Sequence, residues 1–124
     1  MTKAKKILIV EDGKPMARAL ELKLKDAEFD VRVCYDGAEC VRVLKKEQFD
    51  LMLLDIIMPN LDGFEVLAWL KERGKMMHVI VHTNLSQQED KERVLALGAK
   101  EFIVKSDTTI MEVVERVKRI LVIK

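Results

Sequence analysis

The chain has 124 residues and a mass of 14.3 kDa, a length typical of one compact domain that leaves no room for a second. Its 22 basic and 21 acidic residues give a formal net charge of +1, and 49% of the residues are hydrophobic. This balance argues against the clustered basic surface of a nonspecific nucleic-acid binder but leaves room for a small basic patch, and we expect no direct nucleic-acid partner. The composition is that of an ordinary globular domain.

The sequence carries no pattern of export or membrane insertion. Residues 1–6 are basic, but the apolar run that follows covers only residues 7–10, too short for a signal peptide or a membrane span. Cys34 and Cys40 form no CxxC pair and are typical of reduced core thiols in a reducing compartment. We therefore expect a cytoplasmic protein without a membrane partner.

Short apolar runs alternate with longer segments of helical period along the chain. The runs predict strands at residues 7–10, 31–35, 51–54, 79–81 and 102–104. The segments that follow them predict five helices. Apolar faces at helical spacing are formed by Met16, Leu20, Leu24 and Ala27, by Ala38, Val41 and Leu44, by Val66, Leu67 and Leu70, and by Ile110, Val113, Val114, Val117, Ile120 and Leu121.

Capping residues and glycines mark the boundaries of these helices. Asp36 and Asp62 each precede a glycine and predict helix starts, and Ser86 with Glu89 predicts a capping box for the fourth helix. The glycines that predict helix ends are Gly74 and Gly98.

This alternation predicts an α/β fold, a doubly wound parallel sheet with helices on both faces, because parallel strands are joined by right-handed crossovers. Hydrophobic and polar residues alternate in residues 31–35, which predicts an edge strand. Residues 7–10 and 51–54 are wholly apolar and predict buried strands.

Charged or hydroxyl side chains that could bind a ligand or react lie at the ends of four of the predicted strands. Glu11 and Asp12 follow the first, Asp55 the third, Thr83 ends the fourth, and Lys105 follows the fifth. Carboxyl ends of parallel strands share one edge of the sheet, where ligands bind in such folds. One lysine cannot neutralise three carboxylates, so a divalent cation is expected, and a few hard oxygen ligands favour Mg²⁺.

Asp55 is the strongest candidate for a nucleophile, because it directly follows a wholly apolar strand. An aspartate that attacks a phosphoryl group forms an acyl phosphate. Lys105 would then supply a positive charge and Thr83 a hydroxyl donor to the phosphoryl oxygens. Any one acidic residue after a strand is more typical of a helix cap or a solvated turn. The coincidence of three carboxylates, a hydroxyl and an ammonium at one edge favours the chemical interpretation.

Several short segments add a family resemblance to this interpretation. They are Glu11-Asp12, Asp55-Ile-Ile-Met-Pro59, Leu61-Asp-Gly63, Thr83, Gly98-Ala99 and Lys105. In order and spacing they resemble the CheY-like receiver domains of two-component response regulators, over essentially the whole length, residues 1–124. The resemblance implies a flavodoxin-like five-stranded sheet of order 2-1-3-4-5 with five helices.

The resemblance also implies a role for each acidic residue. Asp55 would accept a phosphoryl group from a sensor histidine kinase, a phosphotransfer protein or a small acyl phosphate. Asp12, Asp55 and the backbone carbonyl of Ile57 would bind Mg²⁺ directly, whereas Glu11 would act through water. Such a protein catalyses its own phosphorylation and dephosphorylation and is not otherwise an enzyme.

A conformational switch is implied at Thr83 and Phe102. When Thr83 moves toward the phosphoryl group, the Phe102 ring would enter the space it leaves. The surface formed by the fourth helix, fifth strand and fifth helix would then change its shape, and an unidentified downstream protein would bind it. A homodimer through the same surface is the open alternative. Phe102 lacks the hydroxyl of tyrosine, so we expect its ring to favour the inward position at rest.

Two residues near the strand ends carry further predictions. Ser106 stands where the family usually has proline, and we predict a trans Lys105–Ser106 peptide, since a cis bond before serine costs about 2.5 to 4 kcal/mol. His82 is expected to be half-buried in a central strand and not to contribute to the site.

Three alternatives compete with phosphorylation signalling. A pseudo-receiver would keep the fold as an interaction module without being phosphorylated. A haloacid-dehalogenase-like, magnesium-dependent aspartyl phosphatase usually carries a second acid two residues after the nucleophile, where this chain has Ile57. A flavodoxin-like binder of a flavin phosphate would need a hydroxyl- and glycine-rich first loop, and Glu11 and Asp12 would repel the phosphate. The phosphatase and the flavin binder are therefore disfavoured.

Overall fold

The structure is a computed structural model that describes residues 3–74 and 77–121. Its strands are β1 (Lys6–Val10), β2 (Asp30–Cys34), β3 (Leu51–Leu54), β4 (His78–Thr83) and β5 (Glu101–Val104). Its helices are α1 (Lys14–Asp26), α2 (Gly37–Leu44), α3 (Gly63–Glu72), α4 (Gln88–Ala96) and α5 (Ile110–Leu121), with a 3₁₀ turn, η1 (Lys105–Asp107), before α5. Each predicted strand is present, with ends within one or two residues.

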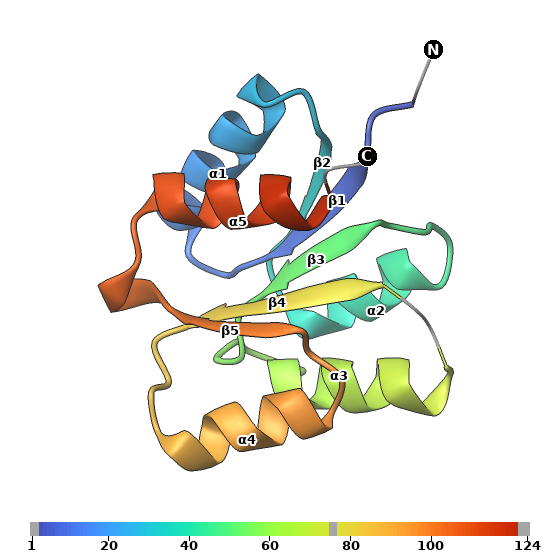
Figure 1. Cartoon of the computed structure of the whole chain (residues 1–124). Helices are drawn as coiled ribbons and strands as arrows, with labels where there is room; N and C mark the ends of the chain where they lie inside the picture. Colours follow the sequence, from blue (N-terminus) through green and yellow to red (C-terminus); the bar gives the residue numbers. More distant parts are fainter. Residues whose placement is uncertain (1–2, 75–76, 122–124) are drawn as a thin grey trace.

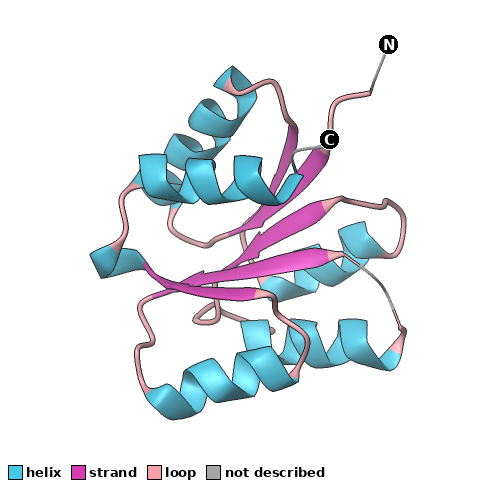
Figure 2. Cartoon of the chain, in the orientation of Figure 1, coloured by secondary structure: helices cyan, strands magenta, loops and turns pink. Residues whose placement is uncertain are grey.

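All neighbouring strands are parallel, in the order β2-β1-β3-β4-β5. The predicted flavodoxin-like fold, its strand order and the edge position of β2 are thereby confirmed. Helices α1 and α5 cover one face of the sheet, and α2, α3 and α4 cover the other (Figure 1). Figure 2 shows the resulting three layers, with the strands between two layers of helix.

Side chains of the central strands alternate between two hydrophobic cores. Leu8 and Val10 of β1 pack in the core on the α2–α4 side, whereas Ile7 and Ile9 pack in the core on the α1 and α5 side. This alternation follows from the two-residue period of a strand. Both faces of β1 and β3 are covered, which explains why their sequences are continuously apolar.

Helix termini agree with the predicted caps except at α4. The Asp62 side chain accepts from the Glu65 backbone N–H in a complete capping box, and Asp36 caps α2 in the same way without the reciprocal bond. The predicted capping box of Ser86 and Glu89 was wrong. Helix α4 begins at Gln88, so its N-cap is Gln87, whereas the box requires Ser86 to be the N-cap. The predicted helix stops have left-handed backbones, with φ of 62° at Gly74 and 107° at Gly98.

The buried face of α2 also differs from the predicted one. Cys40, Val43 and Leu44 are buried, whereas Ala38 and Val41 are only partly so. The buried stripe starts at Gly37, whose missing side chain lets the helix approach the backbone of Leu61. A glycine adds nothing to a hydrophobic pattern, so the sequence did not reveal where the stripe starts.

The cysteines and the surface match the expectations from composition. Cys34 and Cys40 are free and buried, and burial raises the pKa of Cys34 to about 12.

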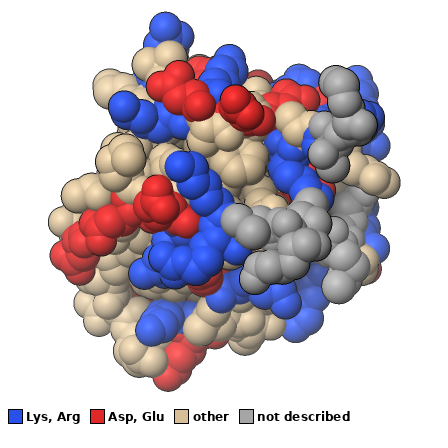
Figure 3. All heavy atoms as spheres, turned by 45° about the horizontal axis from the view of Figure 1, so that its top comes forward, with Lys and Arg blue, Asp and Glu red and all other residues tan. Residues whose placement is uncertain are grey.

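Among the described residues, no helix combines the length and apolar character needed to cross a bilayer. Figure 3 shows basic and acidic side chains mixed on one face of the molecule, as the near-neutral net charge of +1 implies.

Candidate functional site

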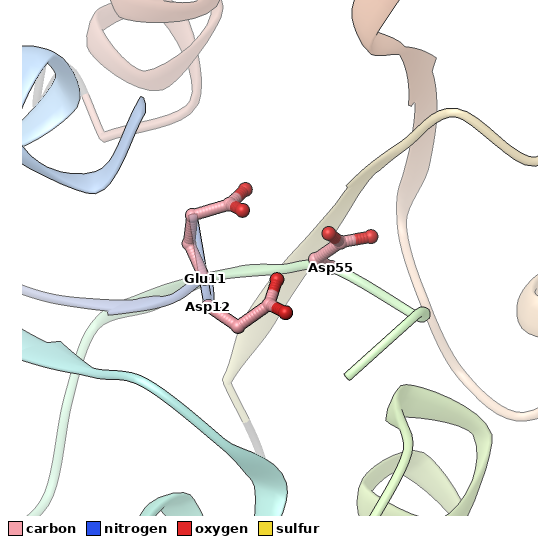
Figure 4. A group of neighbouring side chains, drawn as sticks. All are labelled: Glu11, Asp12 and Asp55. Carbon is pink, nitrogen blue, oxygen red and sulfur yellow. The ribbon is translucent and has the colours of Figure 1, made fainter. Parts of the chain in front are cut away.

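Three carboxylates converge at the carboxyl edge of the sheet. Glu11 and Asp12 follow β1, and Asp55 follows β3. One oxygen of each lies within 4.8 Å of the others, and Figure 4 shows the three side chains next to one another. The neighbouring positions of β1 and β3 in the sheet produce this cluster, as the strand-end argument predicts.

The backbone of this cluster is fixed by the sheet itself. The backbone N–H of Glu11 donates to Cys34 O over 3.0 Å, and that of Asp55 donates to Val10 O over 3.0 Å. The parallel hydrogen-bond pattern thus continues one residue beyond each strand. The carboxylates start from a rigid edge, which suits a site that must hold charges at short range.

Lys105 supplies the positive charge at this edge. Its Nζ lies 2.6 Å from Glu11 Oε1 and 2.7 Å from Asp55 Oδ2. Burial by itself would lower the pKa of Lys105, but hydrogen bonds to Asp55 and Glu11 outweigh burial and raise that pKa. Lys105 therefore remains a cation at neutral pH and offsets one carboxylate charge.

The oxygens of Glu11 are already engaged by donors of the protein. Glu11 is 4% exposed; Oε1 contacts Lys105 and Oε2 accepts from the Gly13 backbone N–H over 3.0 Å. Burial raises the pKa of Glu11, and the bonds to Lys105 and Gly13 offset part of that rise. Asp12, by contrast, is exposed. Asp12 therefore has the most oxygen capacity to offer a cation.

Asp55 is buried, with 5% of its surface exposed. Its Oδ1 accepts from the backbone N–H of Ile57 over 3.3 Å, while the Ile57 side chain points outward and is 56% exposed. Gly63 makes room for the Asp55 backbone, because a Cβ there would lie 2.6 Å from Asp55 O. The glycine at the start of α3 thus permits close packing behind the nucleophile candidate.

Thr83 and Phe102 lie on adjacent strands below this edge. Thr83 is fully buried, and its Oγ1 accepts from the Leu85 backbone N–H over 3.4 Å. The Phe102 ring is partly buried and packs against the α2–α4 core. The inward preference of this ring stays a prediction.

Two polar residues next to the predicted site have surroundings that the sequence did not reveal. Asn84 Oδ1 accepts from the Ser106 backbone N–H over 3.1 Å; the polar residue directly after β4 was the available signal. His82 is 2% exposed, more buried than expected, and among the described residues its Nε2 has no hydrogen-bond partner. The Lys105–Ser106 peptide is trans, as predicted, since the described residues contain no cis peptide bond.

Comparison with known families explains this arrangement. A family model of the response regulator receiver domain matches residues 7–118. The chain belongs to this family. CheY-like receiver domains share the strand order and the two helical layers described above.

Solved receiver structures are similar over nearly their whole length. The receiver domain of a signal transduction histidine kinase from Syntrophus aciditrophicus is 35% identical, with a TM-score of 0.83 over 95% of this chain and 90% of that one. A CheY-like receiver domain from Methanospirillum hungatei JF-1 is 26% identical, with a TM-score of 0.89 over 96% and 94%. The BeF3-activated DrrB receiver domain is 27% identical, with a TM-score of 0.85 over 96% and 98%.

The acidic pocket of this receiver domain has the donor set of a hard divalent cation. Glu11, Asp12 and Asp55 offer carboxylate oxygens within 4.8 Å of one another, and Lys105 leaves part of their charge uncompensated. Oxygen donors with this charge and spacing fit Mg²⁺.

Proposed function

We propose that this receiver domain accepts a phosphoryl group on Asp55 in a Mg²⁺-dependent reaction. The donor is a sensor histidine kinase, a phosphotransfer protein or a small acyl phosphate. One observation carries the proposal: the buried Asp55 carboxylate lies 2.7 Å from Lys105 Nζ and within 4.8 Å of the Glu11 and Asp12 carboxylates. This combines a nucleophile, a fixed cation and a metal pocket in one place.

The two oxygens of Asp55 have different surroundings. Oδ2 is held by Lys105 at 2.7 Å, whereas Oδ1 accepts a longer bond of 3.3 Å from Ile57. Oδ1 is the oxygen with more freedom to attack phosphorus. A new O–P bond forms there as the P–O or P–N bond to the donor breaks, and the donor leaves with that electron pair.

Asp12, Asp55 and the backbone carbonyl of Ile57 would hold the metal directly, and Glu11, whose carboxylate is bound by Lys105 and the Gly13 backbone N–H, would act through water. When bound, the cation supplies charge neutralisation to the phosphoryl oxygens.

Lys105 contributes a donor of its own to the transferred group. An ammonium has three N–H donors, and Glu11 and Asp55 account for two of them. The third can bind a phosphoryl oxygen while the existing ion pairs hold the side chain in place. Thr83 supplies a second donor after its hydroxyl moves from the Leu85 backbone toward the phosphoryl group.

Movement of Thr83 is the proposed start of the output. Phe102 belongs to β5, whose residues pair with β4 in the register Val81 to Phe102 and Thr83 to Val104. A shift at the end of β4 is therefore transmitted to the Phe102 ring and to the surface of α4, β5 and α5. A downstream protein would read that surface, and a second copy of the chain is the other candidate for it.

Intact mass after incubation with Mg²⁺ and acetyl phosphate tests the proposal. The wild-type chain is expected to gain the mass of one phosphoryl group, whereas Asp55→Ala should gain none. Asp26→Ala is the matched control, since Asp26 is exposed in the last turn of α1, away from the site. Wild-type chain that stays unmodified at saturating Mg²⁺ would instead support the pseudo-receiver.

The phosphatase alternative is tested with the same samples. An aspartyl phosphatase would release inorganic phosphate continuously from phosphate monoesters such as p-nitrophenyl phosphate. We propose that the protein is not such an enzyme and expect no turnover with these esters. Sustained, Asp55-dependent turnover would contradict this expectation.

A further inference from the structure

A side chain extends the contact between β4 and β5 beyond the ends of both strands. The last paired residues are Thr83 and Val104. Just past them, Asn84 Oδ1 accepts from the Ser106 backbone N–H over 3.1 Å. Asn84 directly follows Thr83, and Ser106 directly follows Lys105. The bond therefore joins the two chain segments that carry Thr83 and Lys105.

The segment of Lys105 needs such an attachment, because little of it is buried. Ser106 and Asp107 of the η1 turn are exposed, and so is Asn84. The turn is closed locally by a hydrogen bond of 3.3 Å from the Thr108 backbone N–H to Lys105 O. That bond shapes the turn but does not attach it to the rest of the sheet edge, whereas the Asn84 bond does.

The far end of Lys105 is held independently of its backbone. Its Nζ contacts Glu11 and Asp55, while its backbone begins the turn bound by Asn84. A long side chain fixed at both ends loses the rotational freedom that would otherwise spread its charge over many positions.

We propose that Asn84 is a positioning residue for Lys105: its side chain holds the η1 turn against the end of β4, so that Lys105 and Thr83 act on the same phosphoryl group. This inference rests on the proposed function of Asp55. Asn84 touches neither Asp55 nor Lys105 Nζ in the contacts described, so its effect on the reaction passes through the placement of Lys105.

A double-mutant cycle tests the proposal. Asn84→Leu keeps a side chain of similar size but removes the acceptor oxygen. We expect its phosphorylation by acetyl phosphate with Mg²⁺ to be about fivefold slower than wild type, the size of one lost hydrogen bond. In a Lys105→Ala background the same change should have no further effect. Gln88→Ala is the matched control, because it removes an exposed hydrogen bond that the Gln88 side-chain amide donates to Glu92 in α4, and it should leave the rate unchanged.

A second measurement does not depend on phosphorylation. The side-chain ammonium of Lys105, held by two carboxylates, should give a slowly exchanging NMR signal in the wild type, and exchange should speed up in Asn84→Leu but not in Gln88→Ala. An unchanged ammonium signal overturns the proposal, as does an equal slowing of phosphorylation by Asn84→Leu with and without Lys105. Failure of wild-type chain to be phosphorylated would instead refute the function of Asp55, and the positioning role with it.

Discussion

His82 makes the stability of the protein depend on pH. Its side chain is 2% exposed and, among the described residues, its Nε2 lacks a hydrogen-bond partner. Burial, with a smaller contribution from the Lys105 charge, lowers the pKa of His82 from 6.5 to about 4. The folded state therefore takes up a proton on His82 less readily than the unfolded chain.

The sign and size of the effect follow from this difference. The stabilising effect of a neutral His82 is present above pH 6.5 and is lost as the pH falls from 6.5 toward about 4. For these two pKa values, proton linkage lowers the free energy of unfolding by about 2 kcal/mol between about pH 7 and about pH 5. His82→Leu removes the titrating group and should remove this loss.

Urea unfolding between these pH values, on wild type and His82→Leu, measures the effect. Comparing the two chains cancels the contributions of groups that both retain. His78→Leu is the control, because it removes the other histidine from an exposed position at the start of β4. Parallel pH profiles for wild type and His82→Leu would refute the reasoning, and so would an NMR titration that shows protonation of His82 near pH 6.5 in the folded protein.

Three further substitutions test individual contacts by urea or thermal unfolding. Gly63→Ala should lower the free energy of unfolding by about 1 to 3 kcal/mol, because its Cβ would lie 2.6 Å from Asp55 O; an unchanged stability would contradict this packing. Asp62→Ala removes a capping box and should cost about 1 kcal/mol, most of which Asp62→Asn should recover. Lys105→Met leaves two buried carboxylates without their cation and should cost about 3 kcal/mol. Mg²⁺ should stabilise that variant more than it stabilises wild type, and equal stabilisation of the two would argue against the proposed metal pocket.

The fold and the placement of the acidic residues could be predicted from local features of the sequence. Wholly apolar runs such as residues 51–54 mark strands that are covered on both faces. A residue directly after such a strand has its position set by the sheet, so Asp55 and Glu11 had to lie at one edge once the strands were parallel. These conclusions need the strand direction and order but no side-chain detail.

Other features depend on tertiary contacts that no local pattern reveals. The bond from Ser106 to Asn84 joins positions 22 residues apart, and its acceptor is a side chain whose direction depends on how β4 ends. Whether His82 Nε2 finds a hydrogen-bond partner depends on what surrounds it after folding, and among the described residues it has none. Helix α4 likewise begins at Gln88, two residues after Ser86, although the sequence at Ser86 has the pattern of a helix cap.

Strand order explains why the cation of this site is a long side chain. Lys105 follows β5, but Asp55 follows β3 and Glu11 follows β1, so β4 lies between the lysine and both of its partners. Neighbouring strands are about 4.8 Å apart, and Lys105 must cross the end of β4 to reach Asp55 Oδ2 at 2.7 Å. The end of β4 is where Thr83 lies, so any movement of Thr83 toward Asp55 takes place alongside Lys105. The hydrogen bond from the Ser106 backbone N–H, in the turn of Lys105, to Asn84, the residue after β4, therefore links the two groups that the proposed function brings to one phosphoryl group.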